Sequence, residues 1–175
     1  MKTSTKTTEK TNQKKVTDTK EKVADKKTKK AETKKTEPKK IETPKIVARS
    51  SSKFSWPVRG KILSAFGAKN GGLYNDGINI SAAFDSTVVA AENGVVAYAG
   101  NEVRGMGNLI IIQHSDGWMT VYAHLNSMSV RRGARVSVGQ KIGTVGQTGK
   151  VTSPQLHFEI RNGTKAHHPI NYLKK

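Results

Sequence analysis

The residues whose side chains could most clearly take part in chemistry lie in the segment 153–161, which reads SPQLHFEIR. In an extended strand, successive side chains point to opposite faces. The three even-numbered residues from 156 to 160 are Leu, Phe and Ile, so they would share an apolar face that can line a core. The other face would carry Gln155, His157 and Glu159. Imidazole and carboxylate groups bind metal ions and carry protons, so this strand predicts one wall of a polar groove.

Two further segments divide in the same way between two faces. In residues 75–81, two isoleucines would point inward, and the side chains of Asn75 and Asn79 would point outward. In residues 118–125, the odd-numbered residues are apolar, and the opposite face is aromatic and polar, with Trp118, Thr120, Tyr122 and His124. If these polar faces converge, the groove is lined by Asn75, Asn79, His124, Gln155 and His157.

Short β-type runs broken by glycine turns would position these side chains. Asn-Gly and Asp-Gly pairs tolerate positive φ and are the strongest short hairpin signals. They predict hairpins at Asn93-Gly94, Asp116-Gly117 and Asn162-Gly163. No segment keeps a helical period over three turns. We therefore expect an all-β domain, a small antiparallel β-sandwich or partly open barrel with a groove.

The composition of the chain changes near residue 50. Residues 1–50 hold 17 Lys/Arg against 7 Asp/Glu and no aromatic residue, whereas residues 51–175 hold every Trp, Tyr and Phe. High net charge with low hydrophobicity cannot offset the entropy of ordering a chain. We expect residues 1–50 to be a disordered tail or linker and residues 51–175 to be the folded domain. The tail could serve as a solvated tether or contact anionic envelope polymers or a membrane.

Several classes of protein are excluded or disfavoured by what the chain lacks. It has no cysteine, so it forms no disulfide and no thiolate metal site. No run of apolar residues is long enough to span a membrane, and the N-terminus lacks the apolar core of a secretory signal. No stretch of the domain resembles a nucleic-acid-binding motif. We interpret the cluster of Arg131, Arg132 and Arg135 as solvent-exposed side chains on the surface of a hairpin.

Residues 56–173 resemble the LytM/lysostaphin-type zinc endopeptidases of bacterial cell-wall metabolism. The resemblance depends on several stretches that occur in the same order and spacing: NDGINI at 75–80, AAENGVV at 90–96, GNLI at 107–110, TVYAHL at 120–125, GTVGQTG at 143–149 and QLHFE at 155–159. It implies the fold of that family, which is a LytM-like β-sheet groove domain with a duplicated hybrid motif.

The resemblance also implies a set of zinc ligands that this chain has lost. Active members carry His-x-x-x-Asp, Tyr-x-His and His-x-His motifs, in which the first His, the Asp and the last His bind zinc. The first two ligands fall on Asn75 and Asn79, and the opening His of the last motif falls on Gln155. Only His157, at a ligand position, and His124, at an assisting position, remain. Asn amides are neutral and weak ligands, so we expect no zinc, no other cofactor and no catalytic residue.

A non-catalytic member of this family is therefore expected, resembling the NlpD/EnvC-type activators of peptidoglycan amidases. That resemblance implies a role at the cell envelope or in the periplasm during cell division, with the groove binding an amidase segment or peptidoglycan. The export signal would then lie outside this chain. Two alternatives stay open: a zinc-dependent peptidoglycan endopeptidase with substitute ligands, for which Asp76 and Asp85 are the nearest candidates, and a passive peptidoglycan-binding module.

Overall fold

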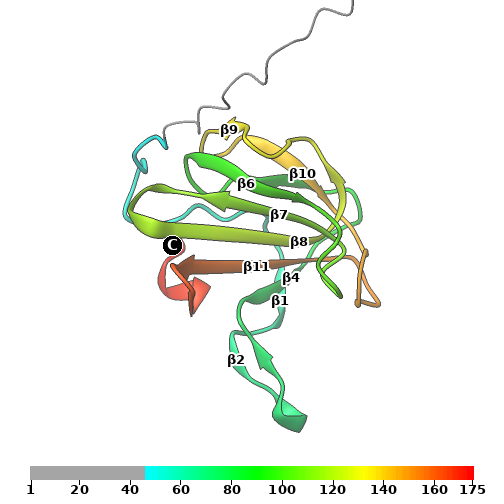
Figure 1. Cartoon of the computed structure of the whole chain (residues 1–175). Coiled ribbons are helices and arrows are strands. Elements are labelled where there is room, and N and C mark those ends of the chain that lie inside the picture. Colours follow the sequence, from blue (N-terminus) through cyan, green and yellow to red (C-terminus); the bar gives the residue numbers. More distant parts are fainter. Residues whose placement is uncertain (1–45) are drawn as a thin grey trace, which may run out of the picture. The chain divides into compact units, whose positions relative to one another are not determined.

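The computed structural model describes residues 46–175 (Figure 1). The predicted disordered tail lies outside the described residues over positions 1–45. The described part is nearly all β-structure, as the sequence predicts. Its twelve strands pair antiparallel, and three short 3₁₀ turns, η1 (Asn70–Gly72), η2 (Ser115–Gly117) and η3 (Pro169–Asn171), interrupt them.

Ten strands form the main sheet, and seven of them follow one continuous order, β1-β4-β11-β8-β7-β6-β9. The strands of this path are β1 (Lys61–Ser64), β4 (Ile78–Ser81), β11 (Gln155–Asn162), β8 (Trp118–Met128), β7 (Asn108–Gln113), β6 (Gly94–Gly100) and β9 (Arg135–Val136). The remaining three are β5 (Thr87–Val89), β10 (Lys141–Val145) and β12 (Lys165–His167). A separate two-stranded hairpin, β2 (Gly67–Ala68) with β3 (Tyr74–Asn75), projects from the β1 and β4 side of the sheet (Figure 1).

The long strand β8 organises the sheet because it pairs with three others. It pairs with β11 and β7 along most of its length, and its end, from Leu125 to Met128, pairs with β10. Strand β10 continues to β5, so the sheet folds over the apolar core. The largest fully buried side chains of that core include Phe54, Tyr122 and Phe158. The architecture is an open, folded sheet, and the sequence-based prediction of its class is confirmed.

Two of the three predicted hairpins are present. The Asp116-Gly117 turn joins β7 to β8, and the Asn162-Gly163 turn joins β11 to β12. The prediction of a hairpin at Asn93-Gly94 is wrong, because the strands on either side of this turn do not pair with each other: β5 pairs with β10, and β6 pairs with β7 and β9. The backbone of Asn93 instead accepts a bond from buried His114, and its side chain binds the loop after β9.

The predicted faces of β11 are confirmed, but those of β8 are not. Leu156, Phe158 and Ile160 are fully buried in the core. Because Phe158 is directly opposite Tyr122 in the sheet, the supposed polar face of β8 also points into this core. The buried hydroxyl groups of β8 are hydrogen-bonded inside the protein: Thr120 donates to the Tyr122 hydroxyl at 2.9 Å, and the Tyr122 hydroxyl also accepts from the Ala91 amide.

Candidate functional site

Three amide side chains form a continuous hydrogen-bonded chain between β3, β4 and β11. The Nδ2 of Asn75 donates to Oδ1 of Asn79 at 3.0 Å, and Nδ2 of Asn79 donates to Oε1 of Gln155 at 2.8 Å. Both ends are secured, since Asn75 also donates to the Ser64 hydroxyl and Gln155 to the backbone carbonyl of Ser153. We call these three residues the amide network. It lies on the sheet face opposite the main core.

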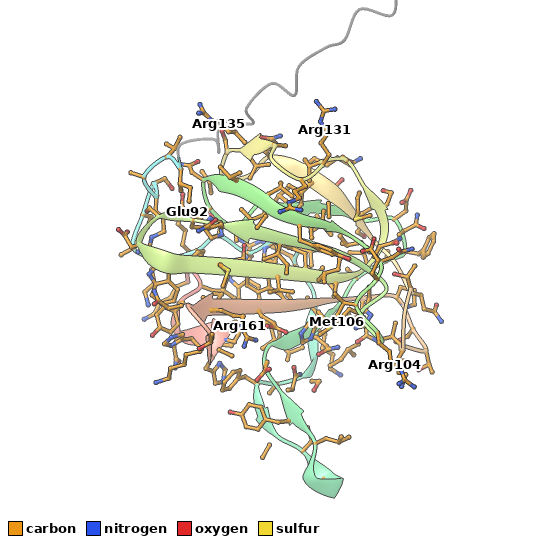
Figure 2. The ribbon with its side chains drawn as sticks, viewed as in Figure 1. Glu92, Arg104, Met106, Arg131, Arg135 and Arg161 are labelled. Atoms are coloured by element: carbon orange, nitrogen blue, oxygen red, sulfur yellow. The ribbon has the colours of Figure 1, made fainter. Side chains whose placement is uncertain are left out.

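His157 extends the amide network along β11. It is directly opposite Asn79 in the register of β4 and β11, and its Nδ1 is 3.2 Å from the Asn79 Oδ1. Its Nε2 is 2.9 Å from a carboxylate oxygen of Glu159, and the other oxygen of Glu159 accepts from Arg161 at 2.7 Å. Arg161, which is labelled in Figure 2, ends this row and also approaches Asp76 at 3.5 Å.

Glu159 is ionised within this row in spite of its burial. Desolvation alone would raise the pKa of the carboxyl group, because burial penalises the charged form. The hydrogen bonds and positive charge of His157 and Arg161 outweigh this effect and hold the pKa of Glu159 below its usual value. The arrangement is therefore a buried, charge-assisted row of side chains in which each polar group has a partner.

His124 reaches the same face through an irregularity in β8. Its φ is +63°, a value that non-glycine residues seldom adopt. Ala123 is opposite His157 and so lies on the same sheet face as the amide network, which we call the front face, yet Leu125 is in the main core. His124 and Ala123 therefore both avoid the core side, as expected where a bulge interrupts alternation. The rings of His124 and His157 are 6.1 Å apart.

The ring of His124 is held in one tautomer. Its Nδ1 is 2.8 Å from the carbonyl oxygen of Thr148, which can only accept, so Nδ1 carries the proton. Burial lowers the pKa of His124, and the nearby His157 lowers it further, against the effect of the Thr148 carbonyl. The backbone amide of His124 donates to the Met106 carbonyl at 2.9 Å. The loops around Met106 and Thr148 thus fix this residue in place.

The side chains at the three ligand positions do not fit a zinc ion. The Asn75 Oδ1 accepts from the Gly77 amide, and the Asn79 Oδ1 is occupied by Asn75 and His157. Zinc sites use nitrogen, thiolate or carboxylate ligands, and only His157 offers one. Among residues 46–175, no group of three or more His, Cys, Asp or Glu side chains is arranged to hold a metal.

The two candidate substitute ligands have other contacts. Asp76 approaches Arg161, and Asp85 accepts a hydrogen bond from Asn126 at 3.0 Å. The residues that the sequence did not predict are the supporting groups Ser64, Ser153 and Thr148. A serine in a neighbouring strand carries no sequence signal for such a role, because only the fold brings it near Asn75.

Comparisons with known proteins agree with this geometry. The sequence pattern described as Peptidase family M23 matches residues 73–169, which include all five predicted site residues. Cell division protein DipM of Caulobacter vibrioides is 50% identical over 116 residues, which make up 66% of this chain and 19% of DipM. Murein hydrolase activator NlpD of Escherichia coli is 47% identical over 122 residues, which make up 70% of this chain and 31% of NlpD. The chain thus spans a fifth to a third of these relatives.

Solved structures of the same fold include peptidases. A zinc-containing peptidase from Vibrio cholerae matches 67% of this chain and 39% of its own, with a TM-score of 0.62 and 27% identity. The catalytic domain of lysostaphin from Staphylococcus simulans matches 65% of this chain and 91% of its own, with a TM-score of 0.60 and 31% identity. This chain belongs to peptidase family M23.

Proposed function

We propose that this chain regulates the hydrolysis of peptidoglycan by binding a cell-wall hydrolase, specifically an amidase, and does not itself cut the wall. The similarity to a murein hydrolase activator over 70% of the chain supports a regulatory role. The choice of an amidase is the finer part of the proposal and follows from the resemblance to amidase activators. The proposed place of action is the cell envelope during cell division.

The amide network carries the proposal: by the resemblance, Asn75 and Asn79 stand at two of the three positions at which active relatives hold zinc, and Gln155 stands at the position of an assisting histidine, while the three amides bond to one another. Without bound zinc, water is not made acidic enough to attack at neutral pH, and no carbonyl is polarised. Gln155 cannot replace a histidine as a proton carrier, because an amide does not titrate near neutral pH. Beyond the bond that they share, Asn79 keeps a second N–H and Gln155 a second oxygen lone pair, and these can hydrogen-bond a partner segment that lies across β4 and β11.

The surroundings of the amide network suit a protein partner. On the neighbouring hairpin, Leu73 and Tyr74 are 69% and 60% exposed. The ring of Tyr74 packs edge-on against Phe66 at 5.6 Å, so an aromatic pair lies next to Asn75. Exposed apolar side chains beside buried polar groups are typical of surfaces that bind a peptide segment. We propose that Asn75, Asn79, His124, Gln155 and His157 form the polar part of that surface.

No helix among the described residues has both the length and the apolar character needed to cross a membrane. The tail at residues 1–50 would connect the domain to its site of action, and its 17 basic residues would favour anionic envelope polymers. This part of the proposal is separate from the binding surface, since it lies largely outside residues 46–175.

The test compares release of label from dye-labelled sacculi by purified amidases with and without the full chain. We expect the chain alone to release nothing and a cognate amidase to be stimulated several-fold. Release by the chain alone that EDTA abolishes would establish an endopeptidase instead. Binding to sacculi without stimulation of any amidase would establish a passive wall-binding module.

A further inference from the structure

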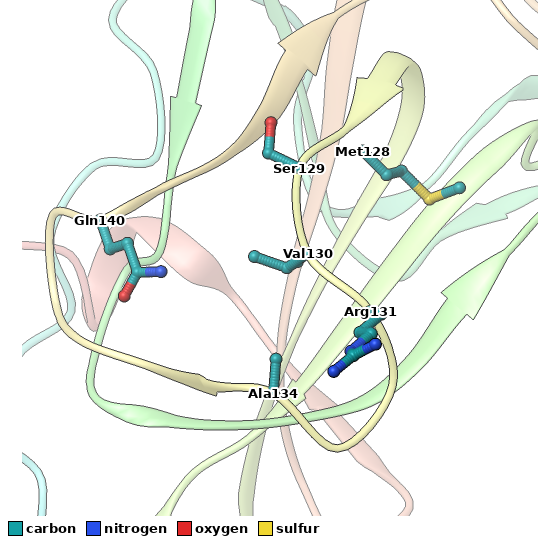
Figure 3. Close-up of a pocket in the computed structure, with 6 residues that line it drawn as sticks. All are labelled: Met128, Ser129, Val130, Arg131, Ala134 and Gln140. Carbon is teal, nitrogen blue, oxygen red and sulfur yellow. The ribbon is translucent and has the colours of Figure 1, made fainter.

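A second surface lies at the far end of the sheet from the amide network. A hollow of about 510 Å³ is lined by Met128, Ser129, Val130, Arg131, Ala134 and Gln140 (Figure 3). These residues precede and follow β9, the last strand in the sheet order. Its apolar side chains come from Met128, Val130 and Ala134, and polar groups surround them. We call this feature the β9 hollow.

The backbone around the β9 hollow is firmly held. Val96 of β6 donates to the Ala134 carbonyl and accepts from the Gly133 amide, both at 2.8 Å. On the other side of the hollow, Ser129 donates to Ile142 of β10. The side-chain oxygen of Gln140 accepts from the Ser137 amide at 3.0 Å, which leaves its NH₂ group as a donor. The loops on both sides of the β9 hollow are therefore held in a fixed conformation by backbone hydrogen bonds.

Arg131 lines the hollow, Arg132 follows it in the same loop, and Arg135 begins β9. Arg131, Arg132 and Arg135 are exposed, and Arg131 and Arg135 point away from the sheet (Figure 2). Within residues 46–175, no ion pair includes any of the three. The six acidic residues of this part each contact another side chain or amide. The loop at the β9 hollow thus carries three positive charges without an ion-pair partner among residues 46–175, beside a floor that is partly apolar.

We propose that the β9 hollow docks on a membrane surface of anionic phospholipid, with lipid phosphates between the arginines and lipid carbon over the floor. Guanidinium groups bind phosphate through paired N–H bonds and are weakly hydrated, which suits a lipid interface. The glycan and peptides of the wall offer carboxylates but no long apolar chain for Val130 and Met128. Nucleic acid is disfavoured because no aromatic side chain lines the hollow to stack on a base.

This docking would leave the proposed partner surface accessible. Three strands, β8, β7 and β6, separate β11 from β9 in the sheet order. Neighbouring strands are about 4.8 Å apart, so β9 lies on the order of 20 Å from β11 along the sheet. A domain bound to lipid through the β9 hollow would keep Asn79 and His157 turned away from that contact. The inference does not depend on the proposed function.

The experiment measures co-sedimentation with vesicles of phosphatidylcholine, with and without phosphatidylglycerol, both for the full chain and for a chain that begins at residue 46; the variants are compared in the latter, because the basic tail would itself bind anionic lipid. The test variant carries Arg131→Gln, Arg132→Gln and Arg135→Gln. The matched control, Arg59→Gln with Lys61→Gln and Lys165→Gln, removes the same charge from exposed residues outside the β9 loop. We expect about 100-fold weaker binding of the test variant to phosphatidylglycerol vesicles, given the contribution of each basic residue near an anionic surface. The control should weaken binding by less than about fivefold.

A further variant, Val130→Asn, tests the contribution of apolar contact in the hollow without changing the net charge, and it should weaken binding by up to about fivefold. Equal losses in the test and control variants would show general charge attraction and overturn the site. Unchanged binding of the arginine variant would overturn it as well. Loss of binding to purified sacculi, with vesicle binding intact, would replace the lipid by a wall polymer. Circular dichroism confirms that each variant is folded.

Discussion

The imidazole of His157 is directly opposite Asn79 across two paired strands, with Nδ1 and Oδ1 3.2 Å apart. In a zinc enzyme of this fold these positions would be two ligands of one ion, separated by the metal. Here the side chains bond to each other instead. The amide of Asn79 also binds Asn75 and Gln155, so it is the central member of the amide network.

This relationship predicts that a metal site can be restored at these positions. The variant Asn75→His, Asn79→Asp, Gln155→His has the motif residues of an active relative and should bind one zinc per chain. The wild-type chain should bind none, because amide oxygens are weak ligands for zinc. Elemental analysis after dialysis against zinc measures both. Stoichiometric zinc in the wild-type protein, removed by EDTA with loss of wall cleavage, would contradict the account of the amide network.

The row from His157 to Arg161 predicts a pH dependence of stability. The pKa of Glu159 lies below its usual value in the folded state, because hydrogen bonds and charge from His157 and Arg161 outweigh burial. The ionised carboxylate therefore contributes stability above the pKa of the unfolded chain, near 4.5, and this contribution is lost as the pH falls through the lowered folded value. Urea unfolding at pH 6 and at successively lower pH should show the loss.

The matched variants are Glu159→Gln and Asp116→Asn. Glu159→Gln should lower stability at pH 6 by about 2 kcal/mol, because it leaves Arg161 and the ring of His157 with a weaker hydrogen-bond acceptor, and should flatten the decline at acid pH. Asp116 has a 75% exposed side chain, so its replacement should leave the curve nearly unchanged. Parallel curves for Glu159→Gln and the wild type would show that this carboxyl group is not the source.

Strand β11 shows what the sequence could predict. Its alternation is regular, so Gln155 and His157 were correctly assigned to one face and Phe158 to the core. Alternation also placed Asn79 on the outward face of its own strand, but its position beside His157 comes from the pairing of β4 with β11, which was only an expectation from the sequence. Local alternation suffices to assign the two faces of a strand where that strand is regular.

Strand β8 shows what the sequence could not predict. Tyr122 belongs to the core because its hydroxyl finds internal partners, and one of them, the Ala91 amide, comes from a residue that is distant in the sequence. His124 reaches the front face through a positive φ that has no sequence signal in a histidine. The pairing of β5 with β10 also depends on long-range contacts, which no turn motif encodes.

The support of His124 predicts a contrast between two glycines. At Gly149, which has a φ of +81°, a Cβ would lie 2.5 Å from the Gly105 carbonyl oxygen and 2.6 Å from the Gly107 nitrogen. Gly149→Ala should therefore displace the Thr148 loop and destabilise the domain by more than about 2 kcal/mol. Gly139 has a similar φ of +78° but open space around it, so Gly139→Ala should cost only about 1 kcal/mol.

Thermal or urea unfolding measures this difference directly. The ring protons of His124, followed by NMR, should shift in Gly149→Ala and not in Gly139→Ala, because Thr148 accepts the Nδ1 proton. Equal destabilisation by the two variants would mean that only the backbone conformation matters and that the close approach of the two loops is relaxed easily.

The start of the folded unit gives a further prediction. Glu92 is fully buried and accepts from the amide and the hydroxyl of Ser50 at 2.8 and 2.7 Å, and from the amide of Asn93. Burial raises the pKa of this carboxyl group, but these bonds more than compensate and lower it below its usual value. A chain that begins at residue 51 removes Ser50 and leaves a buried charge short of partners. We expect it to be about 3 kcal/mol less stable than a chain that begins at residue 46.

The variant Glu92→Gln separates the loss of the bonds from the loss of the segment itself. In the chain that begins at residue 46 it should destabilise the fold, because a neutral amide accepts more weakly and brings donors that need partners of their own. In the chain that begins at residue 51 it should cost less, since an unpaired amide is less expensive to bury than an unpaired carboxylate. Urea unfolding of the four proteins gives the coupling energy between Glu92 and the segment 46–50. A coupling energy of zero would show that the folded domain begins at residue 51 and that the bonds to Ser50 contribute nothing to its stability.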